Sequence, residues 1–108
     1  MTEVLLKNEK EQFTGVLTFD GTVFEAFGFE IGGSFGSFVR VPVAMMASAG
    51  ASFDSGMLKT PKLVITGRED LGLGDLQLPL DPDPSEQAAI AQLVEEIQKA
   101  IDERGGGA

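Results

Sequence analysis

The sequence predicts a mainly β fold that ends in one α-helix. Residues 13–80 consist of short runs of β-type composition separated by turn residues, and no long helical period occurs among them. Residues 84–103 then show one amphipathic helical pattern. A chain of 108 residues has the length of one compact domain. We therefore expect a single domain that spans residues 1–108.

The first two strands are predicted to form a hairpin. In residues 13–19 the large apolar residues share one parity and the threonines take the other, as in a half-buried strand. Asp20 and Gly21 follow directly, and residues 22–31 resume the β-type composition. An Asp-Gly pair between two such runs favours a tight type I′ turn.

Further strands are predicted at residues 37–41, 49–53, 62–66 and 76–80. The glycine-rich segment 32–36 is expected to be a hairpin loop, because its spacing matches neither of the phosphate-binding glycine patterns. The apolar segment 43–47 either continues a strand or turns a corner, and core packing is favoured over an adaptable binding surface for Met45 and Met46. Seven of the eight phenylalanines lie between residues 13 and 38, and we expect them in the core.

The terminal helix is predicted over residues ~84–103, with a frayed tail at 105–108. Its apolar residues recur at helical spacing: Ile90, Leu93, Val94, Ile97 and Ile101. This stripe must be buried for the helix to be stable in water, and docking on the chain's own strands is favoured over docking on another molecule. Asp81, Asp83 and Glu86 could offer oxygen ligands to Ca²⁺ or Mg²⁺, but helix capping explains Asp83 and Glu86 without a metal. No metal site and no cofactor are predicted.

Three stretches of the chain carry a resemblance to a known family. Residues 15–23 (GVLTFDGTV), 40–46 (RVPVAMM) and 62–66 (KLVIT) are similar to the first strand pair, the strand end with its corner, and a later strand of the small bacterial pleckstrin-homology-like (PH-like) domains of the short actinobacterial type. The resemblance implies two near-orthogonal antiparallel sheets that form a barrel, whose open end is plugged by the helix at ~84–103.

The resemblance implies little chemistry. Related domains include peptide-binding and self-assembling modules. Other relatives bind phosphoinositides through basic residues at the first hairpin, but here that hairpin carries Asp20 and Gly21, with Glu25 nearby. Binding of a lipid headgroup is therefore not expected to carry over to this chain.

The charge of the chain is unevenly distributed. The formal net charge is −9, whereas the central segment 40–68 contains four basic residues and one acidic residue. We interpret Arg40, Lys59, Lys62 and Arg68 as a weak basic patch on an acidic body. The overall charge disfavours non-specific nucleic-acid binding and strong binding to anionic membranes.

The residue types that are missing narrow the possible functions. The chain has no cysteine and no histidine, which excludes disulfides, thiolate metal sites and the commonest general base. No catalytic residues are predicted. We expect a cytoplasmic, non-catalytic module that binds an unknown protein partner or copies of itself; the alternative is small-ligand or anion binding through the basic patch. An enzyme would instead need a pocket with a carboxyl group of strongly raised pKa.

Overall fold

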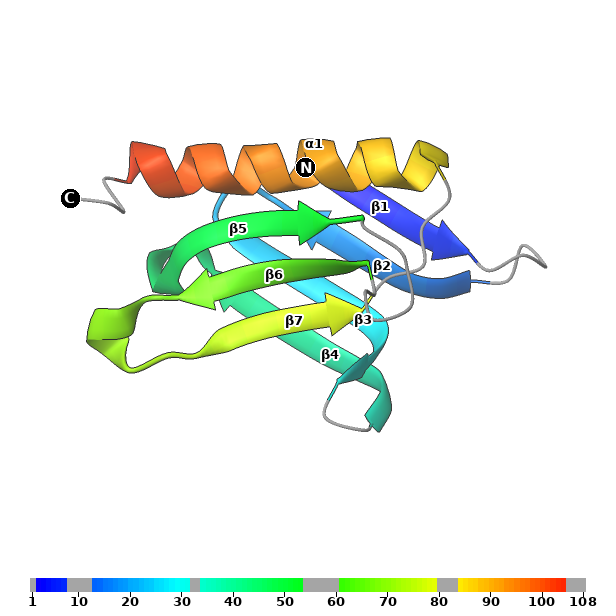
Figure 1. Cartoon of the computed structure of the whole chain (residues 1–108), viewed down its shortest axis with the longest axis horizontal. Helices are drawn as coiled ribbons and strands as arrows, with labels where there is room; N and C mark the ends of the chain where they lie inside the picture. Colours follow the sequence, from blue (N-terminus) through cyan, green and yellow to red (C-terminus); the bar gives the residue numbers. More distant parts are fainter. Residues whose placement is uncertain (1, 8–12, 32–33, 54–60, 80–83, 105–108) are drawn as a thin grey trace.

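The computed structural model describes residues 2–7, 13–31, 34–53, 61–79 and 84–104. Their elements are β1 (Thr2–Lys7), β2 (Phe13–Phe19), β3 (Val23–Ile31), β4 (Ser34–Pro42), the 3₁₀ turn η1 (Val43–Met45), β5 (Met46–Ser52), β6 (Lys62–Gly67), the 3₁₀ turn η2 (Glu69–Leu71), β7 (Asp75–Pro79) and α1 (Pro84–Glu103) (Figure 1). The predicted class, mainly β with one C-terminal helix, is confirmed. The expected cap Asp83, the acid Asp81 and the expected frayed tail lie outside the described residues.

The first sheet is antiparallel and has the order β1-β2-β3-β4. Its first strand, β1, was not predicted, since the strand-rich region was expected to begin at residue 13. In β1 the side chains of Val4 and Leu6 are buried, whereas Leu5 between them is exposed. Three consecutive apolar residues hide the alternation that identifies a strand from its sequence.

The predicted hairpin joins β2 to β3, and its turn depends on Asp20. One carboxylate oxygen of Asp20 accepts hydrogen bonds from the backbone N–H groups of Thr22 and Val23, both at 2.8 Å. These bonds favour the ionised carboxylate and lower the pKa of Asp20. Gly21 has a φ of 101°, which a residue without a Cβ adopts easily.

The second sheet is antiparallel and has the order β5-β6-β7. The chain reaches it through η1, so the apolar segment 43–47 turns a corner and then begins β5. At the end of β6, Gly67 donates its N–H to the carbonyl of Gly74 at 3.2 Å. A Cβ at Gly67 would lie only 2.5 Å from the Cβ of Leu73, so this close approach requires glycine.

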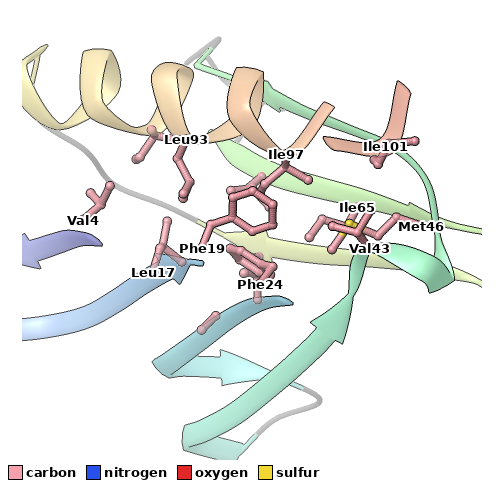
Figure 2. Close-up of a cluster of buried hydrophobic side chains, with 14 of the residues drawn as sticks. Val4, Leu17, Phe19, Phe24, Val43, Met46, Ile65, Leu93, Ile97 and Ile101 are labelled. Atoms are coloured by element: carbon pink, nitrogen blue, oxygen red, sulfur yellow. The ribbon is translucent and has the colours of Figure 1, made fainter. Parts of the chain in front are cut away.

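The helix α1 packs on the chain's own strands, as predicted, and mainly contacts β5 and β1. Ile90, Leu93, Ile97 and Ile101 are at most 1% exposed. Figure 2 shows Leu93 directed towards Leu17, Ile97 directed towards Phe19 and Phe24, and Ile101 near Val43, Met46 and Ile65. Every strand supplies side chains to this core or to its edge.

The two sheets are not closed into a barrel, so this part of the expected architecture is wrong. On one side α1 covers the edge strands β1 and β5 (Figure 1). There the side-chain carbonyl of Gln98 accepts a hydrogen bond from the backbone N–H of Ala49 at 3.1 Å. On the other side β4 and β7 each end their sheet. No ladder of backbone hydrogen bonds joins β4 to β7 within the described residues.

Candidate functional site

The three described members of the predicted basic patch do not form one cluster. Lys62 and Gly67 are the first and last residues of β6, which places them about 16 Å apart along the strand. Arg68 directly follows Gly67, and Arg40 lies on β4 beside the same end of β6, where both Arg40 and Gly67 line a cleft. The structure therefore brings Arg40 and Arg68 to one end and leaves Lys62 at the other. Lys59 lies outside the described residues.

Two of these cations already have partners within the fold. The guanidinium of Arg68 donates to the carboxylate of Asp70 at 3.0 and 2.5 Å and to the carbonyl oxygen of Ala44 at 3.0 Å. The ion pair raises the pKa of Arg68 and lowers the pKa of Asp70. The Nζ of Lys62 donates to the side chain of Gln77 at 3.3 Å. Arg68 therefore connects η2 to η1 through these hydrogen bonds, and the carboxylate of Asp70 neutralises its charge.

A small, mostly apolar cleft opens between the end strands β4 and β7. It has a volume of about 210 Å³ and is lined by Arg40, Val41, Met45, Ile65, Gly67, Leu73, Gly74 and Leu76. Met46 is a core residue as predicted, whereas Met45 is 45% exposed at this cleft, so the core prediction is wrong for Met45. Small-molecule pockets commonly measure about 300–1,000 Å³. This cleft has room for a group about the size of one side chain.

The outer face of the four-stranded sheet carries four apolar residues in register. Leu5 of β1 pairs with Val16 of β2, Val16 pairs with Phe27 of β3, and Phe27 pairs with Phe38 of β4. We call these four residues the apolar row. Leu5, Phe27 and Phe38 are 50%, 45% and 58% exposed, and Val16 is half-buried. With neighbouring strands about 4.8 Å apart, the row crosses roughly 14 Å of sheet.

The two phenylalanines of the apolar row correct the expectation that the phenylalanines of this region are core residues. Phe19 and Phe24 are buried as expected. The rings of Phe27 and Phe38 instead face each other on the outer surface, with their centres 6.5 Å apart and their planes tilted by 53°. Strand parity already carried the signal, because Phe24 and Phe27 are three residues apart in one strand and must lie on opposite faces.

A charged row lies beside the apolar row on the same face. Glu3 pairs with Thr18, Thr18 pairs with Glu25, and Glu25 pairs with Arg40. Glu3 and Arg40 are exposed at opposite edges of the sheet, and Thr18 and Glu25 are half-buried between them. Val39 and Val41, the neighbours of Arg40 along β4, pack against the core. The alternation of β4 therefore places Arg40 on the outer face as well as at the edge that borders the cleft.

A second cavity lies between the first hairpin and the end of α1. It has a volume of about 300 Å³ and is lined by Thr2, Phe19, Asp20, Gly21, Glu96, Lys99, Ala100 and Glu103. The hydroxyl of Thr2 donates to the carboxylate of Glu96. The pKa of Asp20 is shifted downwards, opposite to the direction that a general acid needs near neutral pH. Nowhere in the described part of the chain do three acidic side chains gather as they would around a metal ion.

No family model, curated protein or solved structure matches the chain. Within the described residues, no helix is long and apolar enough to span a membrane. We identify the candidate functional site from geometry. It consists of the apolar row and the charged row, which lie side by side on the outer face of the first sheet.

Proposed function

We propose that this chain is a non-catalytic interaction module that binds a protein through the outer face of its four-stranded sheet. The observation that carries the proposal is the continuity of the apolar row across all four strands of that sheet. Single exposed apolar residues are ordinary on protein surfaces, whereas contiguous ones mark interaction sites. A protein partner that covers the row removes its apolar surface from water, which is the main driving force of association.

The composition of the row suits a protein partner. Aromatic side chains are enriched at the centres of protein interfaces, because they bury a large area while few rotatable bonds are immobilised. Phe27 and Phe38 provide such a pair, and the charged row beside them provides the polar rim that interfaces commonly have. Glu25 and Arg40 lie in that rim, directly next to the two rings along β3 and β4.

The order of the elements supports the resemblance to PH-like domains. Four antiparallel strands precede three antiparallel strands and a C-terminal helix. We infer the kinship from this order together with the sequence stretches at 15–23, 40–46 and 62–66. What the kinship adds is that its members include protein-binding modules. A cytoplasmic location and a single domain over residues 1–108 stay predictions.

The experiment that tests the proposal compares two baits with the wild-type chain in affinity capture from the source cells. Phe38→Ser removes the most exposed ring of the apolar row, and Leu71→Ser removes a leucine of similar exposure from η2, away from this face. We expect Phe38→Ser to reduce capture of a partner at least about tenfold and Leu71→Ser to leave it unchanged. Equal capture by the two variants, with folding verified by circular dichroism, would contradict the proposal.

A second candidate function is the binding of a small anion with an apolar tail in the cleft between β4 and β7. The observation that favours it is the presence of Arg40 in an otherwise apolar lining. Millimolar hexanoate should then shift the amide NMR signals of Gly67, Gly74 and Leu76, and the effect should weaken in Arg40→Gln and at high salt. Unchanged signals in the wild-type chain would exclude this function.

A further inference from the structure

We infer that the partner which the outer face of the first sheet accommodates is a second copy of this chain. The inference rests on the proposed function and names its partner. Its basis is that each of the two rows is self-complementary. When the outer faces of two copies are packed against each other, apolar residues meet apolar residues and an acidic residue meets a basic one. A two-fold axis parallel to the strands, passing between β2 and β3, brings β1 of one copy over β4 of the other and β2 over β3.

This arrangement matches the apolar row with itself. Because the axis runs along the strands, each row stays at its own level and meets the same row of the second copy. Leu5 then lies over Phe38 of the second copy, and Val16 lies over Phe27. The exposed side chains at both edges are covered, and the half-buried Val16 faces a ring rather than a gap. Face-to-face sheets pack about 10 Å apart, which leaves room for such side chains to interdigitate.

The charged row is complementary under the same operation. Glu3 of one copy lies over Arg40 of the other, and the symmetry produces this pair twice. Thr18 of one copy lies over Glu25 of the other, where no cation faces the Glu25 carboxylate. The hydroxyl of Thr18 can donate a hydrogen bond to that carboxylate. Both Glu3 and Arg40 are exposed and form no ion pair within the described part of the chain. Opposite charges at contact distance set the register of such a dimer.

The net negative charge of each copy repels the other copy and therefore limits the affinity of the dimer. Each copy carries a formal charge of −9. At physiological ionic strength, repulsion between charges further apart than about 8 Å is largely screened, whereas the pairs at contact distance are screened less. Among the side chains that the structure describes on this face, three large apolar ones are exposed, namely Leu5, Phe27 and Phe38. We therefore expect a reversible dimer whose population rises with protein concentration.

The experiment measures the mass of the pure chain by sedimentation equilibrium and light scattering over a concentration series in physiological salt. The mass should rise from 11.4 kDa towards twice that value. Phe38→Ser should remain monomeric over the same range. Arg40→Glu places two glutamates opposite each other twice per dimer and should raise the dissociation constant about tenfold or more.

Two further variants separate a specific contact from a change in net charge. Lys99→Glu alters the net charge as much as Arg40→Glu does, but it lies on α1 with a side chain that is 77% exposed, away from the outer face. We expect it to dimerise almost as the wild type does. The double variant Glu3→Arg/Arg40→Glu exchanges the two charges of the pair and should restore dimerisation.

A constant mass of 11.4 kDa at all concentrations would overturn the inference, as would equal effects of Arg40→Glu and Lys99→Glu or a double variant as weak as Arg40→Glu. The proposed function is tested separately by the capture experiment. A monomeric chain whose bait still captures a different protein in a Phe38-dependent way overturns only the second copy as partner. A monomeric chain with Phe38-independent capture overturns both.

Discussion

Replacing Ile97 by alanine is the sharpest test of how this fold is held together. Ile97 is fully buried on the inner face of α1, one turn after Leu93 and one turn before Ile101. Its side chain points into the core towards Phe19 and Phe24 (Figure 2). The helix contacts the edge strands of both sheets, so a defect at this position weakens the contact that holds the two sheets together.

The expected loss of stability follows from the atoms removed. Ile97→Ala deletes three methyl or methylene groups, which at about 0.8 kcal/mol each amounts to about 2.4 kcal/mol of transfer free energy. The cavity that remains adds to this, and comparable substitutions cost about 2–5 kcal/mol. We expect a fall of about 3 kcal/mol in the free energy of unfolding, against a typical total of about 5–15 kcal/mol. The melting temperature should fall by roughly 12 °C or more.

Urea unfolding followed by circular dichroism at 222 nm measures this loss. The chain has no tryptophan and no tyrosine, so the helix signal is a better probe than intrinsic fluorescence. Lys99→Ala is the matched control, because Lys99 lies on the same helix with a side chain that is 77% exposed; it should change stability by less than about 0.5 kcal/mol. If Ile97→Ala unfolded at the same urea concentration as Lys99→Ala, the packing of α1 on both sheets would be refuted.

Three further outcomes are expected. Gln98→Ala removes the acceptor of the Ala49 N–H and should cost about 1–3 kcal/mol in urea unfolding; an unchanged midpoint would show that water replaces the bond. Gly67→Ala forces a Cβ to within 2.5 Å of a leucine Cβ and should cost about 1–3 kcal/mol, whereas Gly50→Ala meets nothing within 4 Å and should be much milder, and equal losses would contradict this. Folding lowers the pKa of Asp20 below its ordinary value of 3.8, so the stabilisation by its carboxylate is present above about pH 4 and is lost as the pH falls through the folded-state pKa. Asp20→Asn should flatten the fall in stability at acid pH, and an identical acid limb in thermal melts would exclude this role.

Local sequence patterns determined the elements whose signal is contained in one segment. The helix at 84–103 could be predicted because its apolar residues recur at helical spacing. Four of these residues, Ile90, Leu93, Ile97 and Ile101, are buried in the structure, and Val94 is half-buried against the core. The hairpin around Asp20 could be predicted because turn residues separate two β-type runs. The strand at residues 2–7 could not be predicted, because Leu5 is an apolar residue at an exposed position and therefore interrupts the alternation of apolar and polar residues in the sequence.

The candidate site shows where sequence patterns stop being informative. Parity along a strand places Phe27 and Phe38 on a face, but the pairing of Phe27 with Phe38, and of Leu5 with Val16, depends on the register between strands. Register is set by backbone hydrogen bonds between segments that can be far apart in the chain, and a shift of one residue would move every side chain to the other face. Charge alone grouped Arg40 with Lys62, although the fold places them at different ends of β6.

By itself, then, the sequence of this protein determined its class of fold, its terminal helix and the face of that helix that is buried, because these follow from periodicities within single segments. Only the tertiary structure decided that no backbone hydrogen-bond ladder joins β4 to β7 within the described residues. It also decided that one apolar residue from each of four strands contributes to a continuous row on the solvent-facing surface of the first sheet. The physical reason is that both features arise from pairing between segments, and the free energy of that pairing is shared by the whole core rather than encoded in any one stretch of the chain.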